Sequence, residues 1–138
     1  MAESYEISAW IALFMGLYAL SASVGEWRNP GMWAAMVEDF GTSPGLRFLT
    51  GIVCIALGAA IYLVNPWRDD WLSILVSALG GLMVVEGMAI LAAGERVMGF
   101  GRRLMEKAGS FWVGLSALIG VGLVLAALSR IGVVAVPV

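Results

Sequence analysis

The chain has 138 residues, enough for one domain, and 61% of them are hydrophobic while only 13% are charged. Soluble globular domains are closer to about half apolar and a quarter charged, so this composition excludes an ordinary soluble enzyme and a disordered chain. The sequence has no histidine, one cysteine and a net charge of −2, which argues against metal sites, catalytic triads, disulfides and nucleic acid as a partner.

Four apolar stretches are long enough to cross a bilayer as helices, which takes ~20 residues each. They cover about 7–24, 46–64, 71–93 and 110–128, without the polar and apolar alternation of barrel strands. The first lacks the basic start of a signal peptide, because no Lys or Arg precedes Arg28. The sequence therefore predicts an all-α integral membrane protein, a four-transmembrane-helix bundle that forms a single membrane domain over 1–138.

The distribution of Lys and Arg predicts the orientation. Arg68 and Arg130 fall on the side of the two termini, and six basic residues fall on the other side. Because basic residues favour the cytoplasmic side, we expect the first and third loops in the cytoplasm and both termini outside. In size and span number the chain resembles, in a general way, small four-helix proteins of bacterial inner membranes, which implies that location.

Each predicted cytoplasmic loop contains a helical stretch with one apolar side. On a helical wheel of 95–108 the basic residues gather opposite the apolar ones; they are Arg96, Arg102, Arg103 and Lys107. This pattern predicts an interfacial amphipathic helix on anionic lipid headgroups, or, more simply, cations that only satisfy the positive-inside rule. The first loop predicts a second such helix over about 30–41, with Asn29 as its N-cap and Pro30 as its first residue.

The order of span, interfacial helix and span occurs twice along the chain. An internal repeat of this kind would relate the halves by an axis along the membrane normal. Convergence under membrane constraints would give the same order without a repeat.

Glu86 is the one ionisable residue well inside a predicted span, about 10 Å below its cytoplasmic boundary at 1.5 Å per residue. The same depth is predicted for Tyr18, Thr50 and Ser116, and Arg47 could reach inward from the boundary. Glu86 is therefore either an interhelical hydrogen-bonding group, neutral or paired with Arg47, or a proton or cation site coupled to transport. A single acid without a second charge along a pathway favours the structural role.

Small residues repeat every four positions along the third span at Ser73, Ser77 and Gly81, a pattern that allows close helix approach. Ser77 and Glu86 are nine residues apart, which places them on opposite faces of one helix. If Glu86 faces the interior, the small residues are free to dock another copy or protein. If the small residues pack internally, Glu86 must find a partner from outside.

These features favour a non-enzymatic protein that acts through assembly, as a homo-oligomer or as an accessory subunit of a larger membrane complex. The alternative is a small proton- or cation-coupled transporter or channel that uses Glu86. We predict no catalytic residue, metal site or cofactor; the expected partners are the lipid bilayer and other membrane subunits or a second copy.

Overall fold

The computed structural model describes residues 2–66 and 69–135, with side chains placed from Ile7 onward and as far as Gly132. These residues form four helices: α1 (Ala2–Arg28), α2 (Met32–Thr42), α3 (Pro44–Val64) and α4 (Trp71–Ala135). Three of them, α1, α3 and α4, are long and apolar enough to cross a membrane. The predicted all-helical chain with membrane-spanning helices is confirmed at this level.

Helix α4 is bent twice, at Ala93 (φ −143°, ψ 43°) and at Ala108 (φ −154°, ψ 41°), where the backbone leaves the helical region. The bends divide α4 into limb a (71–92), limb b (94–107) and limb c (109–135). Glycines follow both bends, at positions 94 and 109. Limb b covers the loop helix predicted over about 95–108, and it remains helical through Gly99 and Gly101.

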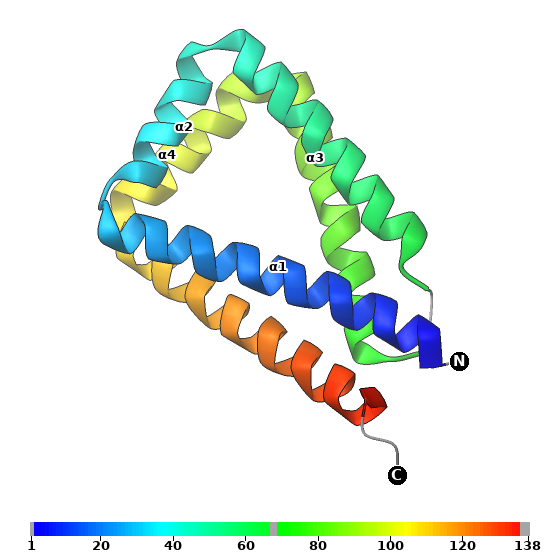
Figure 1. Cartoon of the computed structure of the whole chain (residues 1–138). Coiled ribbons are helices and arrows are strands. Elements are labelled where there is room, and N and C mark those ends of the chain that lie inside the picture. The colour runs from blue at the N-terminus through cyan, green and yellow to red at the C-terminus, as the bar shows by residue number, and fades with distance from the viewer. Residues whose placement is uncertain (1, 67–68, 136–138) are drawn as a thin grey trace.

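The chain outlines an open triangle twice (Figure 1). Helices α1, α2 and α3 form the three sides, and the limbs of α4 follow the same sides in reverse, with limb a on α3, limb b on α2 and limb c on α1. Two antiparallel hairpins result, α1 with limb c and α3 with limb a. They meet at one corner, the closed end, and diverge toward α2 and limb b, the open end.

Both hairpins are held by glycines that bring two backbones together. A Cβ on Gly58 would lie 2.5 Å from the carbonyl oxygen of Gly80, and one on Gly80 would lie 3.0 Å from that of Gly58. The other hairpin has the same reciprocal contact. A Cβ on Gly16 would lie 2.8 Å from the carbonyl oxygen of Gly120, and one on Gly120 would lie 3.0 Å from that of Gly16. Only glycine fits such crossings without movement of the backbone.

The two crossings reveal the internal repeat. Gly16 and Gly80 lie 64 positions apart, and Gly58 and Gly120 lie 62 apart. The next neighbours also match. A Cβ on Gly58 would lie close to the amide nitrogen of Val84, and a Cβ on Gly120 would lie close to that of Leu20, which is 64 positions before Val84. Limb a therefore corresponds to α1, and limb c to α3. Helix α1 and limb a both run from the closed end to the open end. The pseudo-two-fold axis that relates the two halves of the chain therefore runs in the direction from the closed end to the open end.

The start of α2 differs from its prediction. The helix begins at Met32, after Gly31 in the left-handed region (φ 94°) and not after Asn29. The Glu26 carboxylate of α1 accepts hydrogen bonds from the amides of Gly31 (2.8 Å) and Trp33 (2.7 Å). Because this neighbouring acid satisfies the free amides, Asn29 is not needed as a cap, and the predicted capping role is wrong.

Candidate functional site

Glu86 lies on limb a with its side chain exposed. Among the residues that the structure describes, no hydrogen bond or ion pair reaches its carboxylate. The carboxylate is near enough to the Cys54 thiol of α3 for the two to interact electrostatically. Glu86 is therefore an unpartnered acid on a helix of membrane-spanning length.

The structure does not bring the other predicted polar residues together around Glu86. Tyr18 is 78% exposed, Thr50 is half-buried, and the Ser116 hydroxyl donates to the carbonyl of Ala19 at 3.3 Å.

Arg47 is engaged elsewhere. Its guanidinium donates to the Gly41 carbonyl at 2.8 Å and lies 4.0 Å from the Glu95 carboxylate. The ion pair that the sequence suggested between Arg47 and Glu86 is therefore not formed, because α2 ends within reach of Arg47 and provides a carbonyl for it.

The direction of Glu86 follows from helix geometry. Leu72, Leu79 and Glu86 are seven residues apart, so they lie on nearly the same side of limb a. Leu72 is fully buried at the closed end, in a core with Ala9 and Leu123 of the other hairpin. The same side of limb a is exposed at Glu86, farther along the helix, because the hairpins have diverged there (Figure 1).

The small residues of limb a pack inside the molecule. Asn65 is 1% exposed; its side-chain amide donates to the Ser77 hydroxyl and to the Ser73 carbonyl, both at 2.8 Å, and it accepts from the Ser8 hydroxyl at 2.6 Å. Gly81 lies against the ring of Tyr62: a Cβ added to Gly81 would be 3.8 Å from that ring. Of the two arrangements that the sequence allowed, the structure has the one in which the small residues pack internally and Glu86 is exposed.

Asn65 also joins the hairpins, since Ser8 belongs to α1 and Ser73 to limb a. Asn65 lies between the spans predicted over 46–64 and 71–93 and is not among the site residues predicted from the sequence. A signal was available, because Asn65 directly follows an apolar span, where an amide can bond the neighbouring backbone.

Asp70 and Arg130 form a second link at the closed end, with two hydrogen bonds of 2.5 Å between guanidinium and carboxylate. Arg130 also lies over the Trp71 ring, 5.6 Å from its centroid. The hydrogen bond from Arg130 is the main cause that lowers the pKa of Asp70 below its ordinary value of 3.8. In the sequence, Arg130 contributes only to the predicted orientation.

This link predicts an acid-sensitive part of the stability. Because the pKa of Asp70 is lowered in the folded state, its contribution is present above the ordinary value of 3.8 and is lost as the pH falls through the folded pKa. We expect the difference in Tm between wild type and Asp70→Asn, measured in detergent, to shrink from about pH 5 downward. A pH-independent difference would contradict the prediction.

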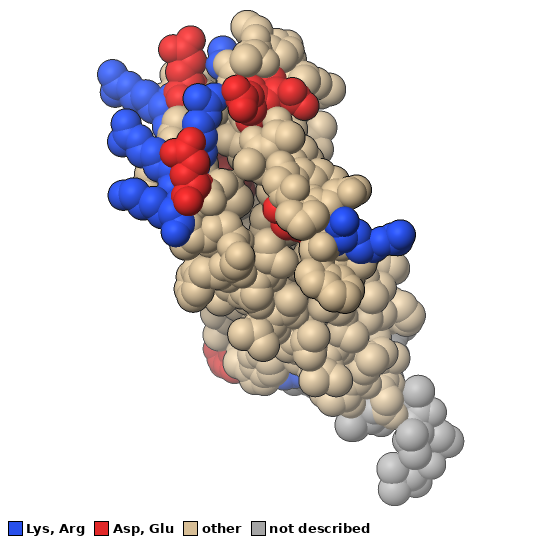
Figure 2. Space-filling model, turned by 90° about the vertical axis from the view of Figure 1, so that its left-hand side faces the viewer, with Lys and Arg blue, Asp and Glu red and all other residues tan. Residues whose placement is uncertain are grey.

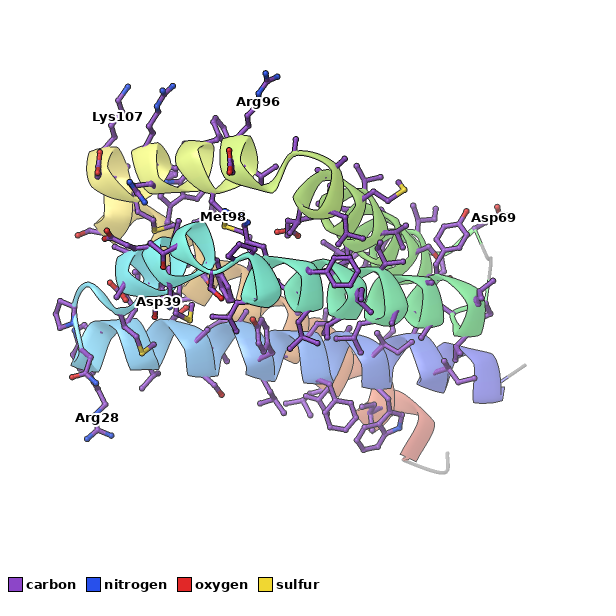
Figure 3. All side chains as sticks on the ribbon, turned by 90° about the horizontal axis from the view of Figure 1, so that it is seen from above. Arg28, Asp39, Asp69, Arg96, Met98 and Lys107 are labelled. Atoms are coloured by element: carbon purple, nitrogen blue, oxygen red, sulfur yellow. The ribbon has the colours of Figure 1, made fainter. Side chains whose placement is uncertain are left out.

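The basic face of limb b consists of four exposed residues: Arg96, Arg102, Arg103 and Lys107. Figure 2, which looks onto the open end, shows Lys and Arg side chains gathered along one edge. In Figure 3, Arg96 and Lys107 point away from α2, whereas Met98, which is 9% exposed, lies between limb b and α2. The apolar side of limb b thus packs on α2. Arg96 and Lys107 face outward, whereas the Arg102 guanidinium reaches back to α2, 3.4 Å from the position of a Cβ on Gly41.

A groove of about 630 Å³ lies between the end of α1 and the start of limb c, lined by Glu26 and Gly109 among others. By the internal repeat, Gly109 corresponds to Arg47, whose side chain occupies the matching corner, where the groove measures only about 170 Å³.

In the described part of the chain, no three residues of the types His, Cys, Asp and Glu come together in a way that could hold a metal ion. What the arrangement can do chemically is attract a cation or donate and accept a proton at Glu86, and attract anions at limb b. Comparison with protein-family models, with curated proteins and with solved structures found no match to this chain.

Proposed function

We propose that the chain is a four-span protein of the bacterial inner membrane that works through assembly with other membrane subunits or copies of itself. In this proposal the spans are α1, α3, limb a and limb c. The hairpins run from the closed end, outside, to the open end, in the cytoplasm. The basic face of limb b and Arg28 at the open end support this orientation through the positive-inside rule.

Under this orientation α2 and limb b lie together at the cytoplasmic interface. Their packing on each other, with Arg96 and Lys107 of limb b outward, supports contact of that face with anionic lipid headgroups.

The observation that carries the proposal of assembly is the exposed, unpartnered Glu86. An acid facing hydrocarbon costs ~2.5–3.5 kcal/mol on insertion scales, so such a residue implies a partner or a function. The chain's own fold offers no reason for it. By the internal repeat, Glu86 corresponds to Ala22, and the hairpin that contains Ala22 forms the same glycine crossing without an acid. The glycine crossing therefore does not require an acid at the position of Glu86.

Native mass spectrometry of protein extracted gently from its own membrane tests this proposal. We expect the wild type to travel with further protein mass, and Glu86→Gln to lose most of it, about tenfold, because the polar contact between spans is weakened. Glu106→Gln, which removes an exposed acid of limb b, is the matched control and should keep the complex. A wild type that travels as a monomer would contradict assembly.

The second candidate is a proton- or cation-coupled transporter or channel, which the free carboxylate of Glu86 also favours. A proton-flux assay in liposomes separates the two candidates. Transport predicts a flux that Glu86→Gln abolishes, and assembly without transport predicts no flux from either protein.

A further inference from the structure

We infer that the partner of Glu86 is a transmembrane helix of another protein that carries a lysine or arginine at the same membrane depth. The inference rests on the proposed function and names the chemistry of the partner.

The surface around Glu86 suits a helix. Leu82 and Ala89, one turn to either side, lie on the same side of limb a, and Leu82 is 62% exposed. At the closed end the same side of limb a is already covered, because Leu72 packs there with Ala9 and Leu123, so the part open to a further helix lies around Glu86. An apolar strip with a small residue and one carboxylate allows a neighbouring helix to approach closely and directs a polar group of that helix to Glu86.

Charge complementarity selects a cation. In a low-dielectric surrounding a carboxylate is neutralised by a proton or by an opposite charge, and intramembrane ionisable groups usually pair with one another. A partner cation removes the penalty of leaving Glu86 in lipid and gives specificity, because helices without it gain nothing from this acid.

A second copy of this chain is the less suitable occupant. Among the described residues, Arg47 and Arg130 are already paired, with Glu95 and Asp70. The remaining described cations are Arg28 and those of limb b, all at the open end. Two copies would therefore bring the same acid to the same depth, with no free cation from the described residues opposite it.

The depth of the partner's cation follows from Glu86, which lies seven residues before the bend at Ala93. Along a helix this distance is about 10 Å. The partner helix should therefore carry its Lys or Arg about two turns inside its cytoplasmic boundary.

A model helix tests the inference without knowledge of the natural partner. The full-length protein is reconstituted in phosphatidylcholine vesicles with a synthetic Leu/Ala helix of about 20 residues that carries one lysine at this depth and a terminal dansyl group. Energy transfer from the protein's tryptophans to dansyl reports association. The control peptide has leucine in place of lysine.

We expect the lysine peptide to associate about tenfold more tightly than the leucine peptide, and Glu86→Gln to abolish this preference. Glu106→Gln should retain it. An unchanged Tm of Glu86→Gln, expected because Ala22 occupies the equivalent position, excludes loss of fold as the cause. Equal association of the two peptides, or a preference that survives Glu86→Gln, would overturn the inference.

Self-association tested in the same vesicles separates this inference from the proposed function. A homo-oligomer that depends on Glu86, with no preference for the lysine peptide, overturns the cationic partner and leaves assembly standing. A monomer in native mass spectra removes assembly itself.

Discussion

Alanine at Gly58 is expected to weaken the α3–limb a hairpin and to lower the free energy of unfolding by about 3 kcal/mol, the upper range for overpacking. The added Cβ would lie 2.5 Å from the Gly80 carbonyl oxygen and 2.8 Å from the amide nitrogen of Val84. Both are backbone atoms, so the clash can be relieved only by separating the helices. Unfolding in mixed micelles, followed by circular dichroism, measures the loss.

Gly122→Ala is the control, because nothing lies within 4 Å of the Cβ it would introduce. Alanine is about 1 kcal/mol better than glycine inside a helix, so this substitution should be neutral or stabilising. The repeat adds a sharper condition: Gly16→Ala and Gly120→Ala should destabilise the other hairpin as well. If Gly58→Ala were harmless, or if only one hairpin responded, the crossings would not hold the fold as described.

Much of the fold could be predicted because lipid restricts the choice. Apolar stretches that must satisfy their own backbone become helices, so α1, α3 and the outer limbs of α4 were visible as spans in the sequence. The helical pattern of limb b was also visible, since its charged and apolar residues separate at the helical period. The start of α2 was missed because its amides are satisfied by Glu26 from another helix, which local capping rules do not consider.

For the candidate site, the sequence predicted two alternative arrangements, with either Glu86 or the small residues facing the interior, and did not decide between them. The spacing of Ser77 and Glu86 established that they lie on opposite faces, but which face is inside depends on what packs against limb a. Asn65 and the glycine crossings decide this, and both arise between segments far apart in the sequence. The correspondence of Glu86 to Ala22 likewise required the matched crossings, because few residues are identical between the halves.

Alanine at Asn65 is the second large effect, with an expected loss of about 2–3 kcal/mol in the free energy of unfolding. The side chain serves three partners at once, the hydroxyls of Ser8 and Ser77 and the carbonyl of Ser73, and all four residues are buried. Its removal leaves these groups without that partner inside the protein, which costs more than the loss of an exposed hydrogen bond.

A double-mutant cycle with Ser8→Ala isolates the link between the hairpins. A coupling energy of about 1 kcal/mol is expected if the 2.6 Å bond holds α1 to the Asn65 corner. Ser129→Ala, which removes an exposed hydroxyl bonded within its own helix, should be silent alone and uncoupled to Asn65. Because α1 and α3 otherwise scarcely touch, Asn65→Ala should also widen the separation of the hairpins at the closed end, measured between spin labels on α1 and α3. Additive losses with no change in that distance would assign the link to the Asp70–Arg130 pair and the buried core around Leu72 instead of Asn65.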